Sequence, residues 1–568
     1  MQLFRRCAEI TTLALCGLLV ADLTLAQDNP ILAEADATSR DAASSIRRIE
    51  PLVRSSRDER RVSKKWRTLD GTDNHRRQRD LGAAHTELRR LVPSDYADGL
   101  EAPAGADRPS ARAVSNALSA APETPRLARW GSDYIWQWGQ FLDHDIDLTD
   151  AHTPAEPFPI PVPATDRLFD PLGSGAVTIN LNRSLYNVRT GATEPRQQIN
   201  EITAWIDASN VYGSDMARAD ALRSHDGTGR LATSPGDLLP FNVFGLPNAG
   251  GDSDALFLAG DVRANEQLGL IAIHTLFVRE HNRYVARLAK KRRTLTGDEL
   301  YLHGRAYVGA LMQSITYNEF LPALIGEDAL RPYRGYKRDR AGGISNLFST
   351  AAYRFGHSLL SPTILRRDKN GEPIEQGDLA LRDAFFRPSR IVDEGGIAPI
   401  LRGLAMQRCR QVDPFVVDDL RNFLFGRPGA GGFDLAALNI QRGRDHGLPS
   451  YNDTRSALGL GRRASFAEVS SDADIQARLA RAYGTVDDID VWIGGLAEDK
   501  VEGAMVGELI RAVLVEQYTR LRDGDRFWYQ RYLKRSDQRL IERTTLSQII
   551  RKNTTVGREL PRDVFRIR

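Results

Sequence analysis

Residues 136–147 read Trp-Gln-Trp-Gly-Gln-Phe-Leu-Asp-His-Asp-Ile-Asp, an apolar helical pattern that carries polar side chains in two directions. At about 100° per residue, Gln140, Asp143 and His144 share one face of such a helix, and Asp145 lies on the opposite face among aromatic residues. An amide, a carboxylate and an imidazole therefore converge on one side, while a separate acid points to another. Because burying an unpartnered polar group is costly, both sets need partners. A His–Asp pair that only caps a core contact fits the same pattern.

Similar apolar periodicity extends along most of the chain and predicts a mainly α protein. Apolar residues recur at helical spacing in seven segments, which are 126–148, 264–290, 301–324, 346–360, 475–484, 501–522 and 536–550. Alternating strand patterns are few and short, as at 176–182. Composition stays even from Trp66 onward, without a repeat or a Gly/Ser linker. We therefore expect one large helical domain with few short strands over residues 66–568.

Composition excludes several classes of protein. The chain has 568 residues, of which 41% are hydrophobic and 27% charged, as in folded globular proteins. Its 77 Lys and Arg residues against 74 acids give a net charge of +3, which is too balanced for a nucleic-acid binder. Three cysteines are too few for a disulfide-stapled scaffold or for a zinc or iron–sulfur site of four cysteines.

Residues 1–26 have the pattern of a secretory signal peptide. Arg5 and Arg6 precede a mainly apolar run, and the small residue Ala26 marks the expected cleavage site. A buried N-terminal helix is the alternative. The run is too short to cross a bilayer and no later stretch reaches membrane length, so we expect a secreted or periplasmic protein without a transmembrane segment. Cleavage would leave Cys409 alone, and the mature chain would have no internal disulfide.

Residues 27–65 are expected to form a flexible basic leader. The segment is rich in Ala, Ser and Asp and then becomes strongly basic, with nine Arg and Lys against three acids over 47–67. Such a charge run is typical of a solvated, mobile segment. Contact with an anionic envelope or polymer surface is an alternative role.

A second polar segment, residues 203–209, reads Thr-Ala-Trp-Ile-Asp-Ala-Ser. In an extended loop, alternate residues project to one side, which brings Thr203, Asp207 and Ser209 together. Two hydroxyls and a carboxylate suit Ca²⁺ better than Zn²⁺. Asp145 is a candidate for a further oxygen ligand from a separate segment.

Seven segments of the chain follow, in order, motifs of one known family. They are residues 138–145, 206–214, 263–266, 279–282, 353–357, 438–447 and 523–528. Together they resemble the animal-type haem peroxidases of the peroxidase–cyclooxygenase superfamily, from about residue 66 to about residue 560. The expected absence of disulfides in an exported member of this family indicates a bacterial source.

The resemblance implies three catalytic side chains on the distal side of a haem. His144 would be the distal histidine, which takes a proton from H₂O₂ and returns it to the leaving oxygen. Arg263 would stabilise the hydroxide that develops as the O–O bond breaks. Gln140, one helical turn before His144, would orient peroxide, water or halide.

The resemblance also implies how haem b is held. His357 would be the proximal ligand of the iron, with Arg354 on the same face. Asn439 would accept the other ring N–H of His357, which fixes the tautomer. Asp143 and Glu266 match the acids that form ester links to the haem in this family, whereas a pair of hydrogen-bonded carboxylates is the alternative.

A structural Ca²⁺ is the second cofactor that the resemblance implies. Its ligands would be Asp145, Thr203, the backbone carbonyl of Trp205, Asp207 and Ser209. The ion would connect the distal helix to the loop.

The function implied is reduction of H₂O₂ to water, through a ferryl haem intermediate, with oxidation of bromide, iodide, thiocyanate or small phenolic donors. A fatty-acid oxygenase of the same superfamily is one alternative. Oxygenases of the cyclooxygenase type carry a radical tyrosine three residues before the proximal histidine and lack the distal arginine. Here the first position is Arg354, Tyr353 lies one residue earlier, and Arg263 is present. A non-catalytic adhesion protein that acts through its leader is the other alternative.

One residue departs from the pattern of the myeloperoxidase-like members. They carry a methionine after the esterified glutamate, and its sulfur bonds to a haem vinyl group. Gln267 stands at that position, and an amide cannot form this sulfonium link. Because the link raises the oxidising power of the haem, chloride is expected to be a poor substrate.

Overall fold

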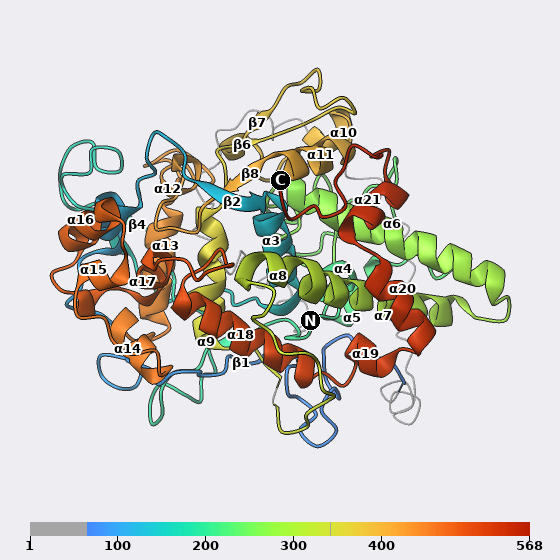
Figure 1. Ribbon diagram of the computed structural model, residues 1–568, viewed down its shortest axis with the longest axis horizontal. Coiled ribbons are helices and arrows are strands. Elements are labelled where there is room, and N and C mark those ends of the chain that lie inside the picture. The colour runs from blue at the N-terminus through green and yellow to red at the C-terminus, as the bar shows by residue number, and fades with distance from the viewer. Residues whose placement is uncertain (1–64, 341, 568) are drawn as a thin grey trace, which may run out of the picture.

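The structure, a computed structural model, describes residues 65–340 and 342–567 (Figure 1). The expected signal peptide (1–26) and nearly all of the expected leader (27–65) lie outside the described residues. About 39% of the residues are helical and the strands are few and short, so the mainly α class is confirmed. Within the described ranges, no helix combines the length and the apolar character needed to span a bilayer.

The long helices account for most of the regular structure. They are α3 (Tyr134–Ile146), α6 (Leu268–Lys291), α7 (Gly297–Ile315), α11 (Ala398–Met406), α13 (Leu435–Asp445), α16 (Ala473–Ala482), α18 (Glu508–Asp523), α20 (Arg535–Arg543) and α21 (Leu546–Asn553). Shorter helices are α2 (Ala111–Val114), α4 (Ser209–Tyr212), α5 (Met216–Ala221), α8 (Leu321–Ile325), α9 (Asn346–Thr350), α10 (Ser389–Asp393), α12 (Asp418–Arg421), α14 (Tyr451–Ala457), α15 (Phe466–Val469), α17 (Val491–Ala497) and α19 (Tyr529–Tyr532).

The remaining elements are π-helical turns, 3-10 helices and antiparallel strand pairs. The π turns are η3 (Ser115–Ser119) and η4 (Thr316–Phe320), and the 3-10 helices are η5 (Ala352–Ser358), η6 (Leu381–Asp383) and η7 (Val486–Asp488). The strand pairs are β1 (Thr86–Glu87) with β5 (Ile199–Asn200), β2 (Leu127–Ser132) with β8 (Arg408–Arg410), β3 (Ile160–Pro161) with β4 (Thr178–Ile179), and β6 (Thr363–Ile364) with β7 (Leu379–Ala380).

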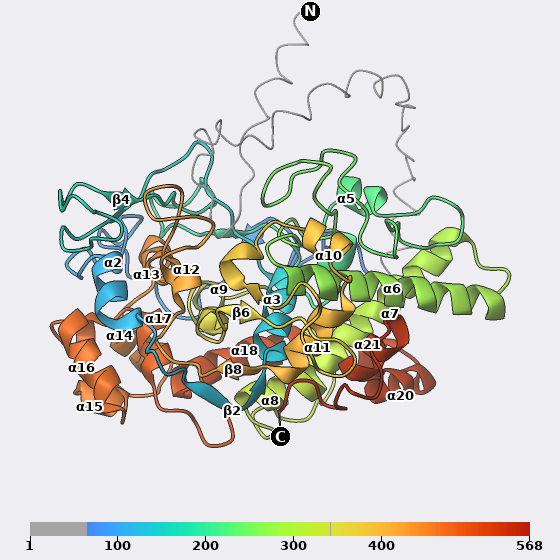
Figure 2. The same ribbon diagram turned by 90° about the horizontal axis from the view of Figure 1, so that it is seen from above.

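Helix α3 lies in the middle of the molecule, between α6 on one side and α9 and α13 on the other (Figures 1 and 2). Its aromatic side chains Tyr134, Trp138 and Phe141 are all fully buried. Phe141 stacks on Phe277 of α6 with ring centroids 5.3 Å apart. Such aromatic pairs contribute about 0.5–1.5 kcal/mol beyond the burial of their surface. This packing fixes the directions in which the polar residues of α3 point.

The prediction of a helix over 126–148 is wrong in its first third. Residues 127–132 form β2 because they pair antiparallel with β8, with Leu127 opposite Arg410 and Ser132 opposite Arg408. Gly131 lies so close to Cys409 that an added Cβ would be 2.7 Å from its Sγ. An extended segment, paired with β8 and bridged at Gly131 to Arg566, replaces the first turns of the expected helix.

Other predicted helices are shorter or divided. The segment 301–324 is α7, the π turn η4 and then α8, which begins at Leu321–Pro322. The segment 536–550 is two helices, since Thr545 caps α21 by accepting from Gln548 N. The segments 501–522 and 264–290 become helical only at Glu508 and Leu268. The strand expected at 176–182 shortens to β4.

Candidate active site

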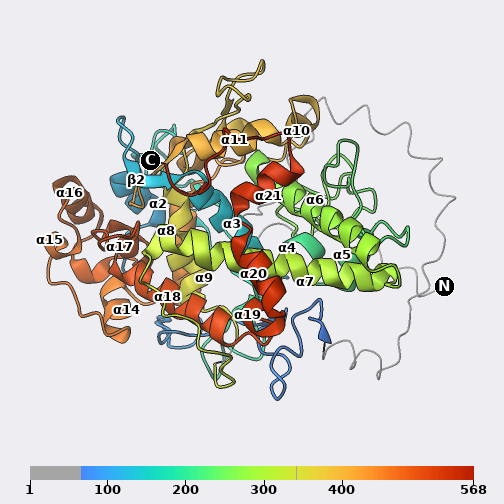
Figure 3. The same cartoon turned by 45° about the vertical axis from the view of Figure 1, so that its right-hand side comes forward.

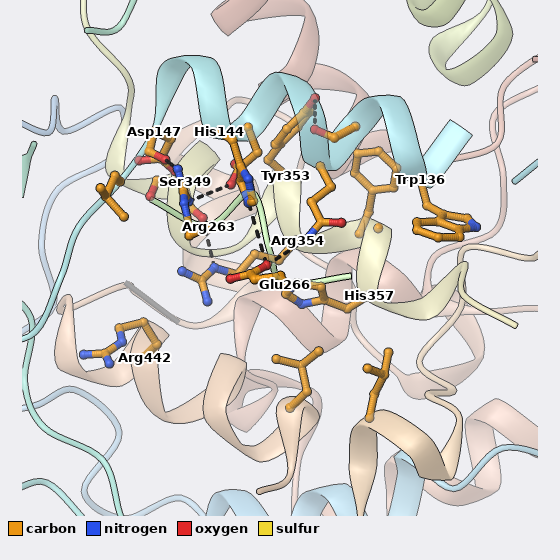
Figure 4. A pocket seen from close by; sticks show the side chains of 18 of the residues that line it. Trp136, His144, Asp147, Arg263, Glu266, Ser349, Tyr353, Arg354, His357 and Arg442 are labelled. Atoms are coloured by element: carbon orange, nitrogen blue, oxygen red, sulfur yellow. Dashed lines mark hydrogen bonds and ion pairs between the residues drawn. The ribbon is translucent and has the colours of Figure 1, made fainter. Parts of the chain in front are cut away.

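A cavity with about 1160 Å³ of open space lies beneath α3 (Figure 4). Side chains that the sequence analysis placed in different segments meet around it, namely Gln140, Asp143 and His144 of α3, Arg263 and Glu266 before α6, and Arg354 and His357 of η5. His144 and His357 approach the cavity from α3 and η5, which pack against each other (Figure 4).

His144 is 1% exposed and has an acid near each ring nitrogen. Its Nε2 lies 3.9 Å from Glu266 Oε2, and its Nδ1 lies 3.4 Å from Asp261 Oδ1. Burial, and then the charge of Arg263, hold the pKa of His144 well below its usual value. A neutral imidazole is therefore present at neutral pH, and it is able to accept a proton.

Arg263 is 2% exposed and is held by Asp261 through two N–H donors. Its Nε and Nη2 donate to the two carboxylate oxygens, each at 2.9 Å, and Nη2 also donates to Asp147 O at 2.9 Å. Burial lowers the pKa of Arg263, but the pairing with Asp261 more than offsets it, so the pKa is raised. A fixed positive charge thus stands beside His144.

Asp261 is a residue that the sequence reasoning missed. Burial would raise its pKa, but Arg263 and then His144 lower it to about 2. Its only sequence signal is its place two residues before Arg263. This carboxylate pairs with Arg263 and lies 3.4 Å from His144 Nδ1, which makes no hydrogen bond within the described part of the chain.

The remaining distal groups form a hydrogen-bonded chain at the edge of the cavity. Gln140 Nε2 donates to Glu266 Oε2 at 2.8 Å, and Gln267 Nε2 donates to Gln140 Oε1 at 3.0 Å. Asp143 lies apart from this chain, with Oδ2 3.5 Å from Arg263 Nη1. Burial, and then the charge of Asp147, raise the pKa of Asp143 to about 8.

His357 lies on a 3-10 helix, rather than on a continuous α-helix over 346–360. Burial and the charge of Arg354 lower the pKa of His357 to about 3, so the ring is neutral and suited to bind a metal ion. Asn439 of α13 meets its Nδ1 at 2.8 Å. The three residues come from two elements that the fold brings together.

The hydrogen bond between Asn439 and His357 runs opposite to the expected direction. The Nδ2 of Asn439 faces His357 Nδ1 at 2.8 Å, because its Oδ1 accepts from Arg354 Nη1 at 3.1 Å. In this orientation the amide donates to the ring instead of accepting from it. Rotating the amide by 180° requires that Arg354 find another acceptor.

Two guanidinium groups and a set of apolar side chains complete the cavity. Arg354 lines it together with Arg442, which sequence reasoning missed, and burial and then Arg442 lower the pKa of Arg354 to about 10. The apolar part of the lining is Trp136, Phe355, Leu360, Leu424, Phe425 and Leu435. Paired guanidiniums suit carboxylates, and apolar walls suit a flat macrocycle. The lining of the cavity therefore fits a haem in its chemistry.

The opposite face of α3 joins the loop at 203–209. Asp145 is fully buried and accepts from Ser209 Oγ at 3.1 Å and from Asp207 N at 3.1 Å. Thr203 Oγ1 donates to Asp207 Oδ1 at 3.1 Å, and Arg305 Nη2 lies 3.4 Å from Asp207 Oδ2. Burial, and then Asp207, raise the pKa of Asp145 to about 8.

The chemistry of this second cluster fits Ca²⁺. Its side-chain donors are carboxylates and hydroxyls, the oxygen ligands that Ca²⁺ prefers. Trp205, expected to contribute its carbonyl, is 1% exposed within the same loop. Among the described residues there is no group of three or more His, Cys, Asp or Glu suited to a metal.

Comparison with known proteins identifies the family. The sequence profile described as animal haem peroxidase matches residues 66–565. The chain belongs to this family. It is 37% identical to human eosinophil peroxidase, over 89% of this chain and 77% of that protein. It is 38% identical to peroxidasin of Drosophila melanogaster, over 82% of this chain but only 34% of that protein.

Solved structures agree with this assignment. Peroxidase A from Dictyostelium discoideum superposes with a TM-score of 0.82 at 33% identity, over 88% of this chain and 99% of that one. A fatty acid alpha-dioxygenase of Oryza sativa superposes with a TM-score of 0.74 at 21% identity, over 88% of this chain and 87% of that one. At that identity the second likeness concerns the fold alone.

Proposed function

We propose that the chain is a haem peroxidase that reduces H₂O₂ to water and oxidises a halide, thiocyanate or a small phenolic donor. The observation that carries the proposal is the meeting of His144, Arg263 and His357 around one cavity. Membership of the family supports it.

Bound haem would supply the iron that activates peroxide and stores its oxidising equivalents. His357 would ligate that iron through Nε2, since Nδ1 faces Asn439. Arg354 and Arg442 would pair with the haem carboxylates, and such a partner for Arg354 would free Asn439 to rotate and accept from the ring.

The distal residues would move and stabilise charge. His144, neutral and buried, would take a proton from H₂O₂ at Nε2 and return it to the leaving oxygen. Arg263 would stabilise the negative charge that develops on that oxygen. Gln140, in the same lining, would orient peroxide or halide.

Two features would set the reactivity of the haem. Asp143 and Glu266 both line the cavity and are the proposed sites of ester links. Gln267 caps α6 by accepting from Gly269 N at 2.6 Å, and it cannot supply a sulfonium link. We therefore expect bromide, iodide and thiocyanate to be oxidised and chloride to be a poor substrate. Hypochlorous acid production equal to that of hypobromous acid at neutral pH would contradict this.

We propose further that Asp145, Thr203, the carbonyl of Trp205, Asp207 and Ser209 bind a structural Ca²⁺. The proposal rests on the two buried carboxylates and on the hydroxyls of Thr203 and Ser209 that hydrogen-bond to them. Export to the periplasm or the medium, and a bacterial source, also remain proposals from the sequence.

No specific observation favours the alternatives. Arg354 stands where an oxygenase of the cyclooxygenase type would need its radical tyrosine, and Arg263 is present and buried. An adhesion protein would need no buried cavity of this composition.

The proposal is tested by measuring the haem content of the protein and its oxidation of donors by H₂O₂. Purified protein loaded with haem should oxidise bromide or iodide with H₂O₂ and leave fatty acids unchanged. His357→Ala should lose most of its haem, measured by the Soret absorbance, because the axial ligand is gone. Full haem occupancy in that variant, or oxygenation of fatty acids by the parent protein, would contradict the proposal.

A further inference from the structure

A row of aromatic side chains leads away from the active-site cavity. Tyr353 lines the cavity, and its ring centroid lies 6.1 Å from that of Tyr518. Tyr518 lies 6.0 Å from Tyr317, which lies 4.8 Å from Trp528. Every step is therefore an aromatic contact, and the row joins η5, α18, η4 and the N-terminus of α19. The elements η5 and α18, which carry its first two rings, pack against each other, and α9 lies beside α18 (Figure 3).

The row is largely shielded from water. Tyr353, Tyr518 and Trp528 are 6%, 0% and 3% exposed. The hydroxyl of Tyr353 donates to Gly139 O at 3.2 Å, and that of Tyr317 donates to Tyr518 O at 2.6 Å. Because backbone carbonyls are not bases, these tyrosines do not readily lose a proton. An indole, in contrast, is able to give up an electron without losing its proton, so Trp528 is the member of the row suited to hold a positive charge.

Trp528 lies in the wall of a separate groove with about 850 Å³ of open space. The groove shares no lining residue with the active-site cavity. Tyr333 and Tyr529 flank the indole, with ring centroids 5.9 and 4.8 Å from it. The groove is lined by the apolar residues Leu321, Pro322, Ile325, Leu330 and Pro332, beside the charged residues Glu327, Arg331 and Arg522. Aromatic and aliphatic walls of this kind suit a flat phenolic ring.

We propose that Trp528 is a remote oxidation site, at which phenolic donors too large for the active-site cavity give up electrons. The inference rests on the proposed peroxidase function, since H₂O₂ is the oxidant. An electron leaves Trp528 and reaches the cavity by way of Tyr317, Tyr518 and Tyr353. A phenol in the groove then returns one electron to Trp528 and releases its proton to water, becoming a phenoxyl radical. Two such steps balance one peroxide: H₂O₂ + 2 ArOH → 2 H₂O + 2 ArO•.

The first experiment locates the radical without relying on activity. Haem-loaded protein is mixed with H₂O₂ and a nitrone spin trap, and the adduct is located by peptide mass spectrometry. We expect an adduct on Trp528 or on Tyr333 beside it, and a loss of about tenfold in Tyr317→Leu, which removes the aromatic ring between Tyr518 and Trp528. Tyr529→Leu is the matched control, because Tyr529 touches Trp528 but lies outside the row. The adduct in this variant should be unchanged.

The second experiment measures donors of two sizes. Phenol coupled to dextran cannot enter the cavity, whereas iodide can. Trp528→Phe should lower kcat/KM for the dextran-linked phenol by about tenfold or more and leave iodide within about twofold. Tyr518→Leu should have the same effect, because it removes the ring between Tyr353 and Tyr317.

The outcomes separate this inference from the proposed function. If the parent protein oxidises iodide with H₂O₂ but no adduct forms at Trp528 or Tyr333, the remote site is wrong and the peroxidase stands. Equal oxidation of the dextran-linked phenol by the parent and Trp528→Phe also overturns it. If the parent protein oxidises neither donor, both proposals fail.

Discussion

At the scale of single residues, Asp261 is the group on which the distal arrangement depends. Its carboxylate accepts from Arg263 N, Nε and Nη2 and lies 3.4 Å from His144 Nδ1. We therefore infer that it holds the arginine in place and favours the His144 tautomer with the proton on Nδ1, which leaves Nε2 free to accept.

Asp261→Asn tests this positioning role. The amide presents an N–H where the carboxylate accepts from Arg263, so we expect the reaction with H₂O₂ to slow by about 10- to 100-fold. Stopped-flow absorbance measures that step, and an unchanged Soret spectrum controls for intact haem binding. If Asp261→Asn reacts with peroxide at the parent rate, this residue has no positioning role.

At the scale of elements, the contact between α3 and the loop at 203–209 joins the proposed Ca²⁺ site to the distal histidine. Asp145 directly follows His144, so the same turn of α3 serves both sites. Asp145→Ala and Asp207→Ala should lower Tm and haem occupancy together. A bound ion whose free concentration is 100 times its Kd contributes about 2.7 kcal/mol to the free energy of unfolding, and both variants would lose this contribution. The exposed Asp107→Ala is the control. Dialysed protein that contains no calcium, yet keeps full activity and an unchanged Tm on calcium addition, would contradict the site.

The π turn η4 carries a second element-scale prediction, concerning pH. Glu319 accepts from Leu546 N, at the start of α21, at 3.2 Å, and burial raises its pKa to about 8. Since the folded-state pKa lies above that of the unfolded chain, its contribution to stability is complete below about pH 4.5 and is lost as pH rises through about 8.

Glu319→Gln keeps an acceptor for Leu546 N but carries no charge. Its Tm relative to the parent should therefore rise steadily between pH 5 and pH 9, as the parent glutamate is forced to ionise. The exposed Glu123→Gln should show no such trend. Thermal unfolding of the three proteins across this range decides the question, and parallel curves for Glu319→Gln and the parent would refute it.

At the scale of the whole molecule, the sequence motifs predicted which residues line the site better than they predicted the contacts between distant segments that hold these residues in place. His144, Arg263 and His357 each lie in a short motif, and motif order was enough to place them around one cavity. Asp261 and Arg442 were missed, because their roles depend on contacts between segments that are distant in sequence.

The errors in the fold have the same physical origin. Residues 127–132 carry apolar spacing that fits a helix, but pairing with a strand almost 280 residues later makes them β2. The orientation of the Asn439 amide likewise depends on a distant residue, because Arg354 donates to its oxygen. Neither effect leaves a signal in the local sequence.

The central claim is that the cavity beneath α3 reduces peroxide with His144 as its acid–base group. The most direct test is the second-order rate of reaction of the haem-loaded protein with H₂O₂, measured by anaerobic stopped-flow for the parent and for His144→Ala at equal haem content. The parent should react rapidly, and His144→Ala should keep its haem but react about 10²–10⁴-fold more slowly, because proton transfer to the leaving oxygen is lost. Equal rates in the two proteins, or no reaction of the parent with H₂O₂, would contradict the account.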